Sequence, residues 1–271
     1  MAINDISLTG AMRANLVSLQ QTASLLERTQ TRLATGKKVN SAIDNPINYF
    51  TAQGHLNRAG DLDARKDQMN EAIQTVKAAD AGIKAITGLI EQARSLAQSA
   101  MASTDATTRA DYAAQFDAVR AQIDALAGDS GYKGTNLING DNLSVEFNED
   151  GSSSLTITGT TATSAGLGIA AAAGSWAADA DITAALSNLD SALTSVRSSA
   201  QTLSSSLGVI EIRSEFVNSM INTLTEGADK LTAADANEEG ANLLMLQTRQ
   251  ALASTALSLA AQSAQSVLRL F

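Results

Sequence analysis

The sequence contains little of what most enzymes and disulfide-stabilised proteins are built from. Among its 271 residues there is no cysteine, one proline, one histidine and one tryptophan, and aromatic residues make up 3%. The absence of cysteine excludes disulfides and thiolate metal sites. The single histidine, His55, cannot build a multi-histidine zinc site or a catalytic triad, and we interpret it as an interface residue. We therefore predict no enzymatic activity, and no catalytic residue, metal site or cofactor.

Basic residues are outnumbered, which argues against two classes of partner. Lys and Arg total 19 against 28 Asp and Glu, giving a formal net charge of −9. A polyanion is attracted neither to nucleic acid nor to an anionic membrane surface, so neither is predicted as a partner. No run of 18 apolar residues occurs, and the first ten residues lack a basic start followed by an apolar core. We expect neither a membrane span nor a cleaved secretory signal.

What the sequence does contain is a long heptad repeat over residues 182–231. Apolar residues alternate there at steps of four and three, with only Ser214 interrupting, and this pattern is typical of a coiled coil. At 1.5 Å per residue such a helix would be about 75 Å long. Its predicted seam consists of Ile182, Leu186, Leu189, Leu193, Val196, Ala200, Leu203, Leu207, Ile210, Val217, Ile221, Leu224, Ala228 and Leu231.

Four further helices are predicted from the same spacing. The first ends near Gly36, which suits a left-handed cap, and the second begins at Pro46 after a cap by Asp44 or Asn45. The second carries a heptad series from Leu62 to about residue 103, and the third covers about residues 105–127. The predicted stripe of the first helix is Met12, Leu16, Leu19, Ala23, Leu26 and Leu33. That of the last helix, from about residue 235, is Met245, Leu252, Ala256, Leu259, Val267 and Leu270.

Between the third and fourth helices the sequence changes to Gly, Ser, Thr and Ala. Residues 143–147 and 155–158 alternate with period two around a turn at 148–151, which predicts a small β-hairpin, and Trp176 should pack this insert onto the helices. The predicted fold is mainly α: an elongated coiled-coil helical bundle with both termini at one end, plus the hairpin insert. The predicted domains are residues 1–40 with 236–271, residues 41–138 with 181–235, and an insert at 139–180.

Several motifs resemble those of one family, the bacterial flagellins. The first group consists of Gly36-Lys37, the Ser-Ala-Ile-Asp-Asn-Pro run at 41–46, and Arg-Ser-Leu-Ala at 94–97. The second consists of Tyr-Lys-Gly at 132–134, Asn-Leu-Ile at 136–138, and the C-terminal run 239–271 ending in Val-Leu-Arg-Leu-Phe. The resemblance covers about residues 1–138 and 182–271. The family motif Asp44, Asn45 and Pro46, together with the C-terminus, is its most specific part.

The resemblance implies a structural subunit of the flagellar filament that assembles with copies of itself for swimming motility. It implies a location in the extracellular filament, reached by unfolded export through the flagellar type III apparatus with an export chaperone. Hook-associated junction proteins and cap proteins are further implied partners. The terminal helices would form the inner tube, with these self-assembly residues: Leu16, Leu19, Leu26, Leu33, Leu252, Leu259, Val267, Leu270 and Phe271.

Two other candidate regions follow from the resemblance. Flagellins sensed by the innate flagellin receptor carry an Arg and a Glu where this chain has Gln92 and Gln115, beside Arg94 and Leu96, so we expect weak recognition. The middle region of about 45 residues indicates a short flagellin. Its candidate sites for O-linked sugar are Ser152, Ser153, Ser154, Thr160 and Thr161.

Two alternatives remain open from the sequence. The hook–filament junction protein shares the terminal helices and the export route, but it more often has a second Asp before the proline of the motif at 44–46. A soluble coiled-coil binding module would share the heptads but would form a small defined oligomer. The motif Asp44, Asn45 and Pro46 favours flagellin.

Overall fold

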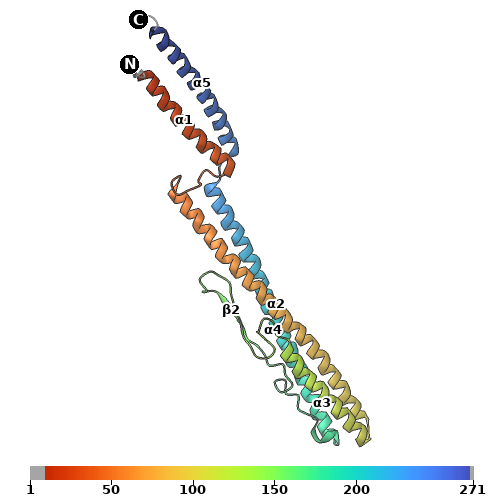
Figure 1. Ribbon diagram of the computed structural model, residues 1–271. Helices are drawn as coiled ribbons and strands as arrows, with labels where there is room; N and C mark the ends of the chain where they lie inside the picture. The colour runs from red at the N-terminus through yellow and green to blue at the C-terminus, as the bar shows by residue number, and fades with distance from the viewer. Residues whose placement is uncertain (1–9, 269–271) are drawn as a thin grey trace, which may run out of the picture. The chain divides into compact units, whose positions relative to one another are not determined.

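The computed structural model describes residues 10–268 as mostly helical, with one small antiparallel sheet (Figure 1). The chain divides into two compact units. Unit 1 comprises Met1–Asn57 and Thr223–Phe271, and unit 2 comprises Arg58–Asn222. The helices and strands of the whole chain, in order, are α1 (Gly10–Thr35), α2 (Pro46–Ala102), α3 (Ala106–Asp129), β1 (Leu143–Glu146), β2 (Ser154–Ile157), η1 (Ala173–Trp176), α4 (Asp179–Thr232) and α5 (Ala236–Leu268). The mainly α fold with a hairpin insert is confirmed, and the three-part domain division stays a prediction.

The helix ends follow from local side-chain chemistry. Asn45 accepts the backbone N–H of Asn48 at 3.1 Å, so Asn45, immediately before Pro46, is the residue that caps α2. Asp105 caps α3 by accepting the N–H of Thr108 at 2.8 Å. At the other end of α1, Gly36 has a φ of 67°, the left-handed conformation that stops a helix and that glycine adopts without a Cβ clash.

The predicted heptads of α2 and α4 form the core of unit 2. Met69, Val76, Ile83 and Ile90 of α2 are at most 2% exposed, and Ile182, Leu189 and Ile210 of α4 are fully buried. Alanines fill the companion positions of α2, which allows the neighbouring helices to approach closely. Phe116 and Ile123 of α3 are fully buried as well. The spine that the heptads of α4 predict is therefore packed inside its own chain.

The hairpin forms with the predicted alternation of side chains. β1 and β2 pair antiparallel, with Leu143 opposite Ile157 and Val145 opposite Leu155. Val145 and Ile157 are buried, while Ser144 and Thr156 face outward. The hairpin thus turns one apolar face toward the helices of unit 2, of which it is a part.

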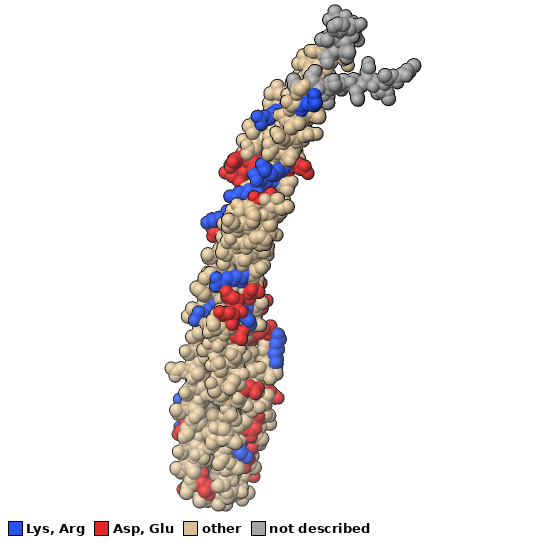
Figure 2. Space-filling view, turned by 90° about the vertical axis from the view of Figure 1, so that its left-hand side faces the viewer, with Lys and Arg blue, Asp and Glu red and all other residues tan. Residues whose placement is uncertain are grey.

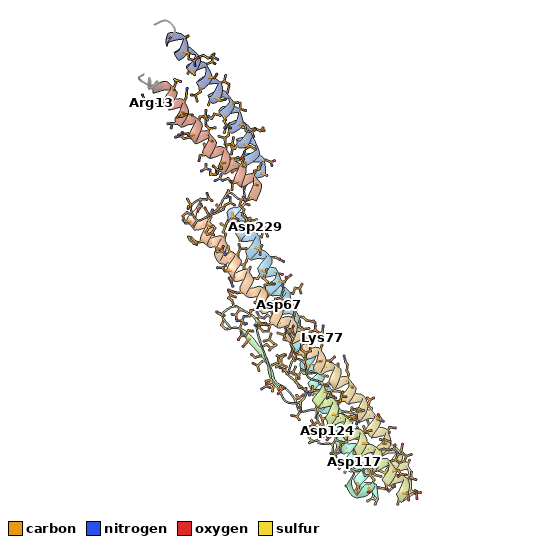
Figure 3. All side chains as sticks on the ribbon, viewed as in Figure 1. Arg13, Asp67, Lys77, Asp117, Asp124 and Asp229 are labelled. Atoms are coloured by element: carbon orange, nitrogen blue, oxygen red, sulfur yellow. The ribbon has the colours of Figure 1, made fainter. Side chains whose placement is uncertain are left out.

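The chain between the hairpin and α4 is fastened to α3. Asp124 accepts both the N–H and the hydroxyl of Ser164, at 2.6 and 2.9 Å, and Asp117 accepts the N–H of Ala172 at 3.1 Å. Figure 3 labels the two aspartates on α3. The Trp176 ring is fully buried, with its centroid 4.9 Å from that of Phe116. The predicted packing of Trp176 against the helices is confirmed.

Candidate self-assembly surface on the terminal helices

The helices α1 and α5 pair with each other within unit 1 (Figure 1). Backbone hydrogen bonds join the end of α1 to the start of α5, and we call these the connecting ends of the pair. The N–H of Ala234 donates to the carbonyl of Gly36 at 2.9 Å, and the N–H of Lys38 donates to the carbonyl of Thr232 at 2.7 Å. Because the end of α1 meets the start of α5 here, the two helices run antiparallel. The start of α1 and the end of α5 consequently lie at the same end of the pair, as predicted.

The inward faces of both helices show a regular spacing of three and four residues. Leu246 is the most buried residue of α5, at 4% exposure, and Thr22 and Thr29 are the most buried residues of α1, at 3% and 6%. The Thr22 hydroxyl donates to the carbonyl of Ser18 at 2.8 Å, so this polar side chain is satisfied inside the seam. The seam residues are Met12, Asn15, Leu19, Thr22, Leu26 and Thr29 of α1 and Glu239, Leu243, Leu246, Gln250, Ala253, Leu257 and Ala260 of α5.

This seam corrects the stripes predicted for the two helices. Leu19 and Leu26 do face α5, but Leu16 and Leu33 are 42% and 41% exposed. On α5 the described part of the predicted stripe lies outside, since Met245, Leu252 and Leu259 are 55%, 67% and 60% exposed and Ala256 is exposed as well. On α5 the apolar residues form two stripes, and pairing uses the one that includes Ala253 and Ala260, whose small side chains permit a shorter distance between the helix axes. Gln250 made that stripe the weaker signal in the sequence.

Among the described residues, one ion pair crosses the seam near the connecting ends. Arg32 Nη1 donates to Glu239 Oε1 at 2.9 Å, with side-chain exposures of 26% and 8%. A carboxylate this buried needs a charged partner, because its loss of hydration is otherwise uncompensated. The pair therefore favours one register of α1 against α5.

The outward face of the pair exposes large apolar side chains along both helices. On α5 this face includes Leu244, Met245, Leu252 and Leu259, each more than half exposed. Exposed apolar surface of this extent marks an interaction site in a soluble protein. Of the predicted self-assembly residues, Leu252 and Leu259 lie on this face, while Leu16 and Leu33 of α1 are 42% and 41% exposed. Leu270 and Phe271 lie outside the described residues, as does the side chain of Val267.

The motif at 44–46 builds the loop between α1 and α2. Asp44 Oδ2 accepts the N–H groups of Asn40 and Ser41, both at 3.0 Å, and the Ser41 hydroxyl at 3.1 Å. The backbone hydrogen bonds from Asn40 and Ser41 lower the pKa of Asp44, because they stabilise its charged form. Asp44 thus folds the loop, Asn45 caps α2 and Pro46 begins it.

The remaining candidate residues lie on other surfaces. Gln92 and Gln115 are exposed, Leu96 is half-buried, and Arg94 Nη2 is 3.2 Å from Asp190 Oδ1 of α4. Weak recognition by the innate receptor stays a prediction. Ser152, Ser154, Thr160 and Thr161 are exposed and Ser153 is half-buried, so four of the five candidate glycosylation hydroxyls belong to exposed residues.

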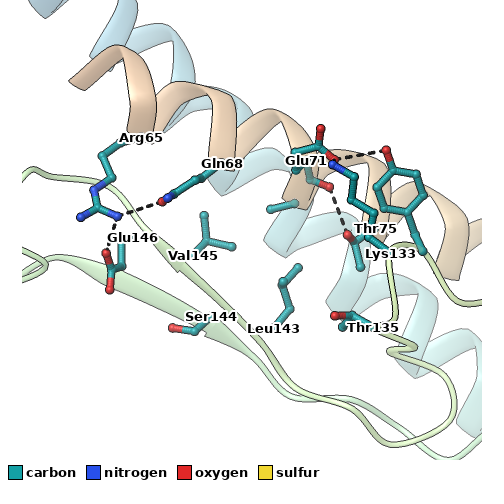
Figure 4. A pocket seen from close by; sticks show the side chains of 12 residues that line it. Arg65, Gln68, Glu71, Thr75, Lys133, Thr135, Leu143, Ser144, Val145 and Glu146 are labelled. Carbon is teal, nitrogen blue, oxygen red and sulfur yellow. Dashed lines mark hydrogen bonds and ion pairs between the residues drawn. The ribbon is translucent and has the colours of Figure 1, made fainter. Parts of the chain in front are cut away.

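A hollow of about 430 Å³ separates β1 from α2 in unit 2 (Figure 4). Leu143 and Val145 point from β1 toward α2. Beside them, Arg65 Nη1 of α2 forms an ion pair with Glu146 Oε2 of β1 at 2.7 Å. Further along, Glu71 Oε2 lies 2.8 Å from Lys133 Nζ, and the hydrogen bond from Lys133 lowers the pKa of Glu71. The same bond raises the pKa of Lys133. These charged groups are paired with each other across the hollow, and they hold the insert against α2.

Charges of both signs are interspersed on the face drawn in Figure 2, and no extended basic region appears there. In residues 10–268, no group of three or more His, Asp or Glu side chains is arranged to hold a metal ion. His55 is half-buried, and its Cδ2 atom lies 3.9 Å from the position that a Cβ on Gly227 would occupy, so it faces α4 within unit 1.

No helix in the described part of the chain is both long and apolar enough to span a membrane.

Comparison with known proteins settles the family. Residues 6–143 match the bacterial flagellin N-terminal helical region, and residues 186–271 match the bacterial flagellin C-terminal helical region. Flagellin FljM of Caulobacter vibrioides is 32% identical to this chain over 277 residues, which cover 100% of both chains. The chain belongs to the bacterial flagellins. It is a structural subunit of the flagellar filament, which is extracellular and polymerises from copies of flagellin.

Other relatives show the same relationship. The flagellin of Brucella melitensis is 29% identical over 269 residues, covering 94% of this flagellin and 95% of the relative. Flagellin A of Rhizobium meliloti is 44% identical over 92 residues, covering 34% of this chain and 23% of the relative. Among solved structures, Bacillus cereus flagellin aligns with 55% of this chain and 88% of its own at 16% identity and a TM-score of 0.49. That last likeness is too distant to carry an argument.

Proposed function

We propose that this flagellin polymerises through the outward face of the α1–α5 pair and acts in the filament without enzymatic activity. The observation that carries the proposal is the row of exposed apolar side chains on a helix pair whose inward seam is already filled. Leu244 and Leu252 are each 67% exposed, and Leu259 is 60% exposed. Full burial of one such side chain contributes about 1.5–3 kcal/mol. Several buried together between copies would supply a large part of the assembly energy.

The same surface accounts for the further partners we propose. Before assembly its apolar residues are exposed to water, which favours a chaperone that covers them during export. Export would use the flagellar type III apparatus, and the absence of cysteine suits a chain passed unfolded, because no disulfide can form on the way. At the ends of the filament, hook-associated junction and cap proteins would contact the faces that the last copies leave uncovered. No finding favours the junction protein or a soluble coiled-coil module as the identity of this chain.

The proposal is tested with Leu252→Ser and Leu259→Ser combined in one chain. Both residues lie outside the seam, and substitutions at exposed positions cost little stability. The free energy of unfolding of the monomer should therefore stay within about 1 kcal/mol of the wild-type value. The critical concentration for polymerisation should rise at least tenfold. The matched control is Ser254→Ala, an exposed polar position of α5 roughly 140–160° around the helix from Leu252 and Leu259, and it should leave polymerisation unchanged. Filaments that form from the double variant at the wild-type critical concentration would remove the proposed surface.

A further inference from the structure

The sequence contains one asparagine that is directly followed by glycine, Asn139 before Gly140. Such a pair can react with itself, because the backbone nitrogen of the second residue can attack the side-chain amide carbon of the first and close a five-membered ring. Glycine has no Cβ and therefore hinders this approach least. Asparagine counts among the thermolabile residues of proteins. The surroundings of the amide in the folded chain decide whether the pair is free to react.

The side-chain amide of Asn139 is free in the folded chain. Asn139 is exposed, and its side chain makes no hydrogen bond within the described residues. Its backbone is placed by a turn, in which the N–H of Asn139 donates to the carbonyl of Asn136 at 3.1 Å. Gly140 follows with a φ of 97°, a conformation that glycine adopts readily and other residues avoid. The turn thus requires a glycine at the position where it makes the asparagine reactive.

Residues 136–148 contain three other asparagines, and the fold restrains all of their side chains. Asn136 is 8% exposed, and its Nδ2 donates to a carbonyl of α3 at 2.7 Å. Asn142 Oδ1 accepts the N–H of Gly159 at 2.9 Å. Asn148 Oδ1 accepts the N–H of Ser153 at 3.0 Å. An amide held in this way must lose its hydrogen bond before it can turn toward the backbone, and none of the three precedes a glycine.

The corresponding aspartate pair, Asp150 before Gly151, is protected by its own turn. The N–H of Ser152 donates to Asp150 Oδ1 at 3.0 Å, and this backbone hydrogen bond lowers the pKa of Asp150. The carboxylate is therefore ionised at neutral pH, and a carboxylate is a much poorer target for a nitrogen nucleophile than a neutral amide. Among the pairs that end in glycine, Asn139 with Gly140 combines the reactive side chain with an unrestrained one.

We propose that Asn139 and Gly140 form a modification site at which folded flagellin slowly deamidates itself, with water as the co-reactant. The Gly140 nitrogen gives its proton to hydroxide and bonds to Asn139 Cγ. The Cγ–Nδ2 bond breaks, and the nitrogen leaves as ammonia after taking a proton from water. Water then opens the resulting succinimide: cleavage of the ring bond between nitrogen and Cγ gives aspartate, and cleavage of the ring bond between nitrogen and the backbone carbonyl carbon gives isoaspartate. Either product replaces a neutral amide by a carboxylate.

The isoaspartate product changes how the insert is fastened. The carbonyl of Leu137 accepts the N–H of Thr160 at 2.7 Å. The carbonyl of Ile138 accepts the N–H of Ala162 at 2.8 Å, and Asn139 is the next residue along this crossing. Because isoaspartate routes the main chain through its Cβ, it adds one atom to the backbone at this point and shifts the register of the crossing. The modification therefore loosens the insert while leaving the helices intact.

Peptide mass spectrometry of aged protein tests the modification. The purified full-length monomer is kept for several weeks at physiological temperature in buffers of increasing pH. Trypsin together with a glutamyl endopeptidase then releases residues 134–146, which contain Asn136, Asn139 and Asn142 in one peptide. Conversion at Asn139 should be at least tenfold faster than at either neighbour and should accelerate with pH, with isoaspartate detected by an isoaspartyl methyltransferase. Equal rates at the three positions would overturn the proposal, as would an unmodified Asn139 in the folded chain when the same chain in urea is converted.

Asn139→Gln is the matched variant, because glutamine keeps an exposed amide but would have to close a less favourable six-membered ring. It should show no conversion at this position, whereas Asn218→Gln, at an exposed asparagine of α4 followed by serine, should leave conversion of Asn139 unchanged. Limited proteolysis reports the effect on the insert. Aged wild-type protein should be cleaved there several-fold faster than fresh protein, and aged Asn139→Gln should not. Converted chains that are cleaved no faster than fresh ones would reject the loosening. All of these measurements use the monomer, so their outcome is independent of the proposed polymerisation.

Discussion

Glu239 of α5 and Arg32 of α1 form a 2.9 Å ion pair between residues 207 positions apart in the sequence, with the Glu239 side chain only 8% exposed. The pair lies close to the backbone hydrogen bonds that join Gly36 to Ala234. One end of the α1–α5 pair is therefore fixed by polar contacts, while the rest is held by a seam of modest apolar and small side chains. This makes the ion pair important for the register of the two helices.

Arg32→Ala should destabilise the α1–α5 pair, because it leaves the carboxylate of Glu239 nearly buried without a partner. The expected loss in the free energy of unfolding is about 1–3 kcal/mol. Urea unfolding of the monomer, followed by circular dichroism, measures it. Adding Glu239→Gln should recover part of the loss, and Arg28→Ala, at an exposed position without an ion pair among the described residues, should change little. Equal losses for Arg32→Ala and Arg28→Ala would contradict this role.

Leu246→Ala and Leu244→Ala should separate folding from assembly. Leu246 is 4% exposed in the seam, so its truncation should lower the stability of the monomer by roughly 2 kcal/mol. Leu244 is 67% exposed, and its truncation should leave the monomer unchanged while raising the critical concentration for polymerisation. Thermal melts and sedimentation of polymer report the two quantities. The interpretation fails if Leu244→Ala is the more destabilising change in the monomer.

Gly82 and Gly88 of α2 should respond to alanine in opposite directions. A Cβ at Gly82 would lie 2.3 Å from Ser130 Oγ and 2.7 Å from Ile138 Cδ1, whereas a Cβ at Gly88 would meet nothing within 4 Å. Gly88→Ala should stabilise the protein by about 0.5–1 kcal/mol through helix propensity. Gly82→Ala should destabilise it by about 1–3 kcal/mol, because the loop after α3 must move. Denaturant unfolding of both variants checks the sign, and stabilisation by Gly82→Ala would show that the loop yields freely.

Asp44 should make the stability of unit 1 depend on acid pH. Its pKa in the folded state is lowered below the ordinary value of 3.8, chiefly by the N–H groups of Asn40 and Ser41. The stabilisation is therefore present above that value and is lost as pH falls through the folded pKa. Asp44→Asn keeps an acceptor oxygen but removes the charge.

The stability difference between wild type and Asp44→Asn should consequently be largest near neutral pH and shrink as the pH falls below 3.8. Urea unfolding at a series of pH values measures it. The control, Asp61→Asn, replaces an exposed aspartate of α2 that has no ion pair or hydrogen bond in the described part of the chain, and it should show no such profile. A difference that persists unchanged at low pH would exclude the charge as its cause.

Much of the fold follows from local patterns. The heptads of α2 and α4 predict two long helices with a shared core, because an apolar residue at nearly every seam position leaves one face to bury, as Ile83 and Leu189 do. The cap by Asp44 or Asn45 and the glycine at position 36 predict two helix ends within a few residues, because such residues satisfy backbone groups of their own neighbours. The hairpin follows from alternation around a turn.

Less of the candidate self-assembly surface on α1 and α5 could be predicted from the sequence. The flagellin resemblance predicts a self-assembly role for Leu252 and Leu259, and the structure leaves both exposed. The sequence pattern does not predict which residues of α5 pair with α1. Leu246 enters the sequence analysis only within the C-terminal run 239–271. Its place in the seam is not predicted, because Gln250 interrupts the apolar series and alanines complete it. The exposed side chains of Val209, Ile212 and Phe216 on α4 are not predicted either, because the stronger heptad pattern on the same helix dominates the sequence.

The sequence by itself determined where helices begin and end, which residues form the core of unit 2, and the flagellin resemblance. Only the tertiary structure decided which of the two apolar stripes on α5 faces α1. The reason is physical: a helix with two comparable stripes can bury either one, and the choice depends on the partner helix. Here the partner offers small residues for close approach and an ion pair between Arg32 and Glu239. The stripe left outside, with Leu252 and Leu259, is thereby free for other copies.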